Sequence, residues 1–183
     1  TWEDLSPTGN ELPEKIRFVS PTFSNSAPFF SNIDDALDSF TGTLVVYEGT
    51  YTPTVSFACN VVAIGKVKIG TVSAVNINIQ GNNLTITTLS LNGSTNTNIK
   101  ALKITSVSLE NSDAKIAVES ADYVTLLGSC DLDFSGDINN SFQAVTGDGN
   151  VKITSYRIGE INAGGYFNVR VDAEICNAIQ AIS

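Results

Sequence analysis

The best candidates for chemistry in this chain are three aspartates, Asp131, Asp133 and Asp137, in the segment CDLDFSGD. Asp131 and Asp133 are two residues apart, so in a β-strand their carboxylates project from one face, with Leu132 and Phe134 on the other. Two neighbouring carboxylates are what a glycosidase or a calcium site requires. The same alternation is also the ordinary outer face of an amphipathic strand, and we favour this second interpretation.

Other charged residues in the same part of the chain support the same interpretation. The pairs Glu110 with Asp113 and Glu119 with Asp122 lie among small polar residues, and we interpret them as turn residues. Five lysines are expected on a solvated face rather than around an acidic substrate: Lys66, Lys68, Lys100, Lys103 and Lys115.

Histidine is absent from the sequence, which removes the commonest general base and the commonest zinc ligand. The three cysteines, Cys59, Cys130 and Cys176, lie far apart in apolar segments, and no C-x-x-C motif occurs. We predict buried free thiols rather than a disulfide or a metal site. We therefore expect no catalytic residue, no cofactor and no bound metal.

The overall composition also limits the possible partners. The chain has 183 residues, with 19 carboxylates against 10 Lys and Arg, a net charge of −9. Such a surface repels nucleic acid and anionic membranes, and we expect neither as a partner. No run of about 18 apolar residues occurs, so we expect no transmembrane segment. The polar, acidic first residues predict no signal peptide.

A repeat predicts the elements that position these residues. From about residue 43 to 134, pairs of apolar residues with one residue between them recur, separated by Asn, Gly, Ser and Thr. Three interleaved series share a period of about 18 residues: Val67, Leu84 and Leu102; Val72, Leu89 and Val107; and, more loosely, Ile77, Ile99 and Ile116.

A shared period with three short strands per repeat is typical of a solenoid. We therefore predict an all-β protein, with a parallel β-helix over residues 31–134. The alternative is an antiparallel sandwich of many short strands, which also predicts alternation and turns. A sandwich does not predict a constant distance between every third strand, and we favour the β-helix for that reason.

Two further segments flank the repeat. Residues 1–30 contain four of the five prolines and are expected to form an extended N-terminal arm. Next, Ser31 or Asn32 can cap a short amphipathic helix over residues 32–40, which would cover the open end of the first coil.

After about residue 135 we expect the period to be lost. The run Gly147-Asp148-Gly149-Asn150, between FQAV and VKITSY, predicts a β-hairpin. Residues 135–183 are accordingly interpreted as a small C-terminal β-element that closes the other end of the solenoid or mediates assembly.

The run NIDDALDSFTGTLVVYEGTYTP, followed by VVAIG, resembles the start of the right-handed parallel β-helix in pectate-lyase-like proteins and phage tailspikes, and the likeness covers about residues 30–134. In its small size, acidic charge, polar arm and minimal coils, the chain looks most like the short β-helical proteins that decorate phage capsids. We expect such a protein of a marine tailed phage. This resemblance implies right-handed coils. It also implies a structural virion protein without enzymatic activity, a homotrimer bound to the major capsid protein on the capsid exterior.

Two other functions remain as alternatives. The first is a tailspike-like receptor-binding protein or depolymerase, with polysaccharide as its partner. Lyases of this fold use a cationic base beside acidic residues that hold calcium, but Arg17, Arg157 and Arg170 all lie outside the predicted repeats. The coils also have no long insertions to wall a cleft. The second is an ice-binding or adhesive solenoid with a flat ladder of threonines; no T-x-T motif recurs in every coil, so we rank it last.

Overall fold

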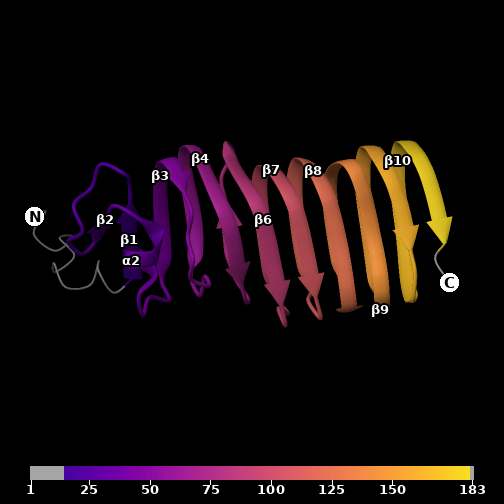
Figure 1. The fold of residues 1–183 in the computed structure, drawn as a ribbon, viewed down its shortest axis with the longest axis horizontal. Coiled ribbons are helices and arrows are strands. Elements are labelled where there is room, and N and C mark those ends of the chain that lie inside the picture. The colour runs from indigo at the N-terminus through magenta and orange to yellow at the C-terminus, as the bar shows by residue number, and fades with distance from the viewer. Residues whose placement is uncertain (1–14, 182–183) are drawn as a thin grey trace, which may run out of the picture.

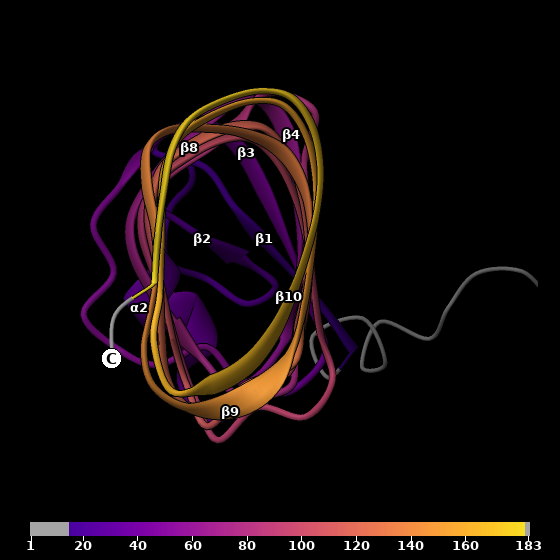
Figure 2. The same ribbon diagram turned by 90° about the vertical axis from the view of Figure 1, so that its right-hand side faces the viewer.

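The apolar pairs recur every 18 residues or so because each turn of the chain lies on the turn before it. The computed structural model describes residues 15–181, and these wind into a β-solenoid of about eight turns (Figure 1). Every ladder between its named strands is parallel. Seen from its C-terminal end, the chain winds anticlockwise toward the viewer, which makes the β-helix right-handed (Figure 2). The predicted fold class is confirmed.

Long strands bend around the corners of the solenoid, so one strand often covers most of a turn. In chain order they are β1 (Ile16–Val19), β2 (Phe29–Phe30), β3 (Thr43–Tyr51), β4 (Asn60–Ala74), β5 (Asn78–Gln80), β6 (Leu84–Asn92), β7 (Thr97–Glu110), β8 (Ala114–Ser129), β9 (Leu132–Ala163) and β10 (Tyr166–Ala181). A single short helix is described, α2 (Ile33–Leu37), and none in residues 15–181 is long and apolar enough to cross a membrane.

The register of the strands explains the sequence period. Val72, Leu89 and Val107 are paired in successive turns, as the second series predicts. The third series needs one correction, since Ile99 pairs with Ile79 and not with Ile77. Ile77 is buried, but it lies one position before the paired residues of β5. The corner of the next turn contains more residues, so the first interval of the third series is longer than 18 residues.

Inward side chains form one continuous apolar column along the solenoid. In the two turns that follow Val107, Val124 and Phe142 occupy the same register position, and both are fully buried. Each inward side chain packs on those above and below it, so the core has no layer that is stable without its neighbours.

Outward side chains form three faces, which we name by their register columns. The first face carries Asn60, Asn78, Asn98, Lys115, Asp133, Lys152 and Arg170. The second face carries Lys68, Thr85, Lys103, Ser120 and Asp137. The third face carries two columns: Thr71, Thr88, Ser106, Tyr123 and Ser141, and beside them Ser73, Ser90, Ser108, Thr125 and Gln143.

One corner of successive turns, which we call the left-handed corner, depends on residues with positive φ. These residues are Asn76 (φ 54°), Gly93 (71°), Asn111 (45°), Gly128 (73°), Gly147 (123°) and Gly165 (66°). Only Gly, and to a lesser extent Asn, adopts this conformation without a large steric cost. The corner therefore places Gly or Asn at intervals close to the coil period, a second repeat that runs beyond residue 134.

The hairpin predicted at Gly147–Asn150 is wrong. This segment lies inside β9, and its strand neighbours are β8 on one side and β10 on the other, both parallel. Gly147 makes the same corner as Gly128, its register partner. The predicted loss of period after residue 135 is also wrong, because residues 135–181 continue the same stack of turns. A left-handed glycine serves a hairpin and a coil corner equally, so the local sequence does not distinguish them.

The N-terminal end also differs from the prediction. Residues 1–14 of the expected arm lie outside the described residues. Residues 16–30 are not an extended arm, because β1 pairs in parallel with β3, β2 pairs with β1, and Val19 is buried in the core. Apolar residues in this segment bury themselves against the first coil, which overrides the proline-rich composition.

The short helix is confirmed, although it spans only Ile33–Leu37 rather than residues 32–40. Asn32 is the N-cap and its side chain accepts a hydrogen bond from the Asp35 backbone N–H, while Ile33, Ala36, Leu37 and Phe40 are all buried. The helix lies beside β1 and β2 at the N-terminal end of the solenoid (Figure 1). This end is therefore covered by strands and a helix together, rather than by the helix alone.

Candidate functional site

The first face contains a shallow groove of about 520 Å³, which is the candidate site. Two neighbouring columns of side chains line it. The charged column is Lys115, Asp133, Lys152 and Arg170, and the corner column is Asp113, Asp131, Asn150 and Asn168. The parallel stacking of β7 to β10 brings together these residues, which are widely separated in the sequence.

Opposite charges alternate along the first three positions of the charged column. Asp133 lies between Lys115 and Lys152, and Arg170 follows in the last turn. The Nζ of Lys152 is 4.0 Å from Oδ1 of Asp133, and both side chains are about half exposed. An exposed pair at this distance adds little stability, so these groups remain available to a polar ligand.

The corner column is held together by its own hydrogen bonds. The backbone N–H of Asp131 donates to Oδ1 of Asp113 (3.1 Å), and the backbone N–H of Asn150 donates to Oδ1 of Asp131 (2.6 Å). The side-chain amide of Asn168 in turn donates to Oδ1 of Asn150 (3.4 Å). Asp113 and Asp131 therefore join successive turns at this corner, which agrees with their interpretation as structural residues.

Of the three candidate aspartates, the structure brings two together. Asp133 lies on the outer face of β9 and Asp131 directly precedes this strand, while Leu132 and Phe134 are buried, as predicted. Asp137 belongs to the second face, where its Oδ1 accepts the backbone N–H groups of two residues in the next turn, Tyr156 and Arg157, both at 3.0 Å.

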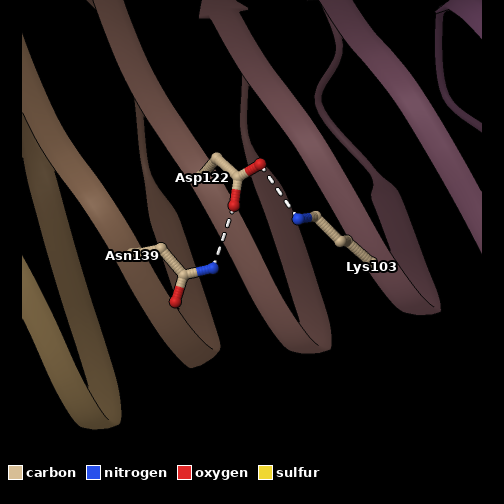
Figure 3. Close-up of polar contacts among 3 residues, drawn as sticks. All are labelled: Lys103, Asp122 and Asn139. Carbon is tan, nitrogen blue, oxygen red and sulfur yellow. Dashed lines mark hydrogen bonds and ion pairs between the residues drawn. The ribbon is translucent and has the colours of Figure 1, made fainter.

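A separate polar cluster on the second face perturbs one carboxylate (Figure 3). Asp122 accepts a hydrogen bond from Nδ2 of Asn139 (2.9 Å) and pairs with Nζ of Lys103 (3.0 Å). The hydrogen bond from Asn139, and then the Lys103 ammonium, hold the pKa of Asp122 below its ordinary value of 3.8. The cluster joins three turns and does not border the groove.

The remaining basic residues divide between solvent and structure. Lys66, Lys68, Lys100 and Lys115 are exposed, as predicted, whereas Lys103 is engaged by Asp122. Arg157 and Arg170 lie within turns of the solenoid, so placing them outside the repeats was wrong.

Arg17 has a structural position at the N-terminal end. Its Nη1 donates to the carbonyl oxygens of Ala36 and Asp38 at the end of α2, and its guanidinium lies over the ring of Phe40. These contacts fix the helix against β1 and leave Arg17 remote from the groove.

The cysteines are free thiols, and their burial agrees with the prediction at two of the three positions. Cys59 and Cys130 are buried, and Cys176 is partly exposed in the last turn. Burial raises the pKa of the Cys59 thiol to about 11, which keeps it protonated at neutral pH. Among residues 15–181, no three His, Cys, Asp or Glu side chains lie close enough together to hold a metal ion.

The third face carries a regular pattern of hydroxyl residues, although it is not a T-x-T repeat. In three successive turns, the two columns carry hydroxyl residues at both positions: Thr71 and Ser73, Thr88 and Ser90, Ser106 and Ser108. Tyr123 and Thr125 continue the pattern in β8. Its ten column positions carry no charged side chain, although the chain is strongly acidic.

Sequence reasoning missed the C-terminal half of the groove. Asn150, Lys152, Asn168 and Arg170 follow residue 134, where the solenoid was expected to end. The signal that predicts them is the left-handed corner, because Gly128, Gly147 and Gly165 continue the coil period to the last turn.

The comparisons with known proteins identify no relative: no protein-family model, curated protein or solved structure matches this chain.

Proposed function

We propose that this chain is a structural virion protein that binds the outside of a phage capsid as a homotrimer and stabilises it. The observation that carries this proposal is that aspartate carboxylates link successive turns by hydrogen bonds. Asp113, Asp131 and Asp137 each accept a backbone N–H from the next turn. These carboxylates strengthen a rod, which favours a mechanical function over hydrolysis. The resemblance to capsid-decorating β-helical proteins supports the same proposal.

A rigid rod suits this function for a simple physical reason. A trimer that bridges neighbouring capsid subunits adds contacts that internal genome pressure must break before the shell opens. Parallel ladders along the whole solenoid, around a close-packed core, allow little bending, so that load passes between the attachment points.

The third face provides a surface on which identical copies can meet side by side. Each chain has a net charge of −9, so copies repel one another wherever acidic side chains face each other. All ten residues of the two columns are uncharged, and those of the first three turns, such as Ser90 and Ser108, are small, which favours close approach of two faces. We assign the contacts of the trimer to this face.

Location on the virion tests the proposal directly. Antibody-labelled protein should coat the outside of purified capsid shells, and heads that lack the protein should burst at a lower temperature than complete heads. If purified heads carry none of the protein, the proposal is wrong.

The trimer contact is tested by light scattering on the full chain. Ser90→Glu places a carboxylate in the middle of the third face and should separate the trimer. Thr85→Glu is the matched control, because it adds the same charge on the second face, between Lys68 and Lys103. Equal masses for the two variants would contradict the assignment to the third face.

The groove on the first face favours a second candidate, a tailspike-like protein that binds or depolymerises a surface polysaccharide. Lys152, Arg170 and Asn168 present donors there, and Asp133 presents acceptors, which suits a polar sugar chain. A glycan array with product detection tests this function, and Asp131→Asn and Asp133→Asn should then weaken binding or cleavage. No binding and no cleavage by the wild type would remove this candidate.

A further inference from the structure

The corner at Asn92 and Gly93 differs chemically from the other left-handed corners. Of all asparagines in the sequence, Asn92 alone directly precedes a glycine. The other corner residues with positive φ follow different residue types: Val75, Glu110, Leu127, Thr146 and Gly164. In an Asn-Gly pair the side-chain amide is unusually prone to attack by the next backbone nitrogen, because glycine has no Cβ to shield that nitrogen.

Gly93 also has free space around it. A Cβ added to Gly93 would meet nothing within 4 Å, whereas a Cβ on Gly147 would collide with the backbone of Gly128 in the neighbouring turn. Asn92 and Gly93 are both exposed to solvent. The nitrogen of Gly93 can therefore turn toward the Asn92 side chain without meeting a neighbouring turn.

Two hydrogen bonds to the next turn hold the reacting groups apart. Nδ2 of Asn92 donates to Oε2 of Glu110 (2.8 Å), its register partner in β7. The backbone N–H of Gly93 donates to the carbonyl oxygen of the same glutamate (3.0 Å). Both contacts lie at an exposed corner, where water competes with them and local opening costs little free energy. The fold therefore slows the reaction without preventing it.

We propose that Asn92 is a site of covalent modification, at which the side-chain amide is converted to a carboxylate through a cyclic imide with Gly93. The Gly93 nitrogen gives its proton to solvent hydroxide and forms a bond to Cγ of Asn92. The Cγ–Nδ2 bond breaks, and Nδ2 leaves as ammonia after it takes up a proton from water. A second water molecule then opens the ring at either carbonyl, which yields aspartate or isoaspartate. The net change is the replacement of ammonia by water, with no oxidation or reduction.

The product loses the contact that the amide makes with the next turn. A carboxylate at position 92 lies opposite the carboxylate of Glu110, and like charges at facing positions destabilise a strand pair. Isoaspartate also adds one methylene group to the main chain at the corner. The modification therefore weakens the link between β6 and β7, in the middle part of the solenoid (Figure 1). This inference goes beyond the proposed function and does not depend on it.

Peptide mapping by mass spectrometry tests the site on the full, folded chain held at pH 8 for increasing times. The exchange of ammonia for water changes the mass of the modified peptide. We expect Asn92 to be converted at least about tenfold faster than any other asparagine of residues 15–181, because no other precedes glycine. The proposal is overturned if Asn92 keeps its amide, or if another of these asparagines is converted faster.

Two variants test the assigned causes. Gly93→Ala places a Cβ in open space and shields the nitrogen, so conversion of Asn92 should fall at least about tenfold. Glu110→Ala removes the carboxylate that holds the amide, so conversion should become several times faster. Glu119→Ala is the matched control, since it removes another exposed carboxylate away from this corner and should leave the rate unchanged. A rate in Glu110→Ala that is unchanged or lower would refute the protecting contact, and a melting curve for each variant confirms that it is folded.

Asn92→Asp tests the structural consequence directly. At pH 7 this variant should melt about 2–4 °C below the wild type, because it exchanges a hydrogen bond for two facing carboxylates. Adding Glu110→Gln to Asn92→Asp should recover most of this loss, since the second charge is then gone. A melting temperature of Asn92→Asp equal to that of the wild type would overturn the inference that the modification weakens the solenoid.

Discussion

At the scale of the residue, polar side chains in this protein act mainly between turns. Asp131 accepts hydrogen bonds from both the backbone and the side-chain amide of Asn150, one turn further along. Its exposure could be predicted from the alternation in CDLDF. Its partner could not, because Asn150 is 19 residues away and was expected in a hairpin.

Asp131→Ala should lower the free energy of unfolding by about 1–2 kcal/mol, since it leaves the Asn150 N–H without its acceptor. Asp131→Asn keeps an acceptor oxygen at the same position and should stay within about 0.5 kcal/mol of the wild type. Urea denaturation of both variants measures the difference. A loss of the same size in Asp131→Asn would show that the charge, rather than the hydrogen bond, is what stabilises the corner.

The Asp122 cluster predicts a pH dependence of stability. Its pKa is lower in the folded chain than the ordinary 3.8, so the ionised carboxylate stabilises the fold above that pH. This contribution, about 0.5 kcal/mol for a partly exposed pair, should be lost as the pH falls from 3.8 through the lower folded pKa. The stability difference between the wild type and Asp122→Asn, followed by urea denaturation from pH 7 to pH 2, should shrink over that range.

Asn139 is the control for this cluster, because its hydrogen bond is the largest cause of the lowered pKa. When Asn139→Ala is present in both proteins, the pH-dependent part of the stability difference caused by Asp122→Asn should become smaller. An unchanged pH profile in Asn139→Ala would contradict the assigned cause.

At the scale of the element, the corners decide how the strands follow one another. Gly147 has φ 123°, and a Cβ on it would collide with the backbone carbonyl of Gly128 in the turn before. The sequence around Gly147 therefore serves close stacking of two backbones. The helix at residues 33–37, by contrast, was predictable from its cap and apolar spacing, because both are local signals.

Gly147→Ala should destabilise the protein by at least about 3 kcal/mol, because a new methyl group meets rigid backbone as well as an unfavourable φ. Gly93→Ala is the matched control. Gly93 also has positive φ (71°) but nothing within 4 Å of its added Cβ, so its loss should be about 1–2 kcal/mol. Thermal melting compares the two, and equal losses would show that φ alone sets the cost.

At the scale of the whole molecule, the core is a single column that the chain builds turn by turn. Cys59 and Cys130 lie in this column, several turns apart, and both are buried. The predicted burial of these thiols follows from their apolar neighbours in the sequence. Cys176 belongs to the same kind of segment, yet it is partly exposed, in the last turn that the structure describes.

A thiol reagent should therefore leave Cys59 and Cys130 unmodified in the native protein at pH 8. Burial blocks access, and the pKa of Cys59, at about 11, leaves almost no thiolate. In urea both thiols should react, as mass spectrometry of labelled peptides would report. Rapid labelling of Cys59 without denaturant would show that the column opens at its N-terminal end.

What the sequence determined by itself is the local plan: alternating apolar residues, a period of about 18, a capped helix and turns rich in Gly and Asn. These follow from the conformational preferences and hydrophobicity of residues close together in the chain. The tertiary structure alone decided which side chains meet across turns, and that GDGN forms a corner rather than a hairpin. The physical reason is that a strand edge acquires its partner only when the chain returns a whole turn later, and no local preference specifies that partner.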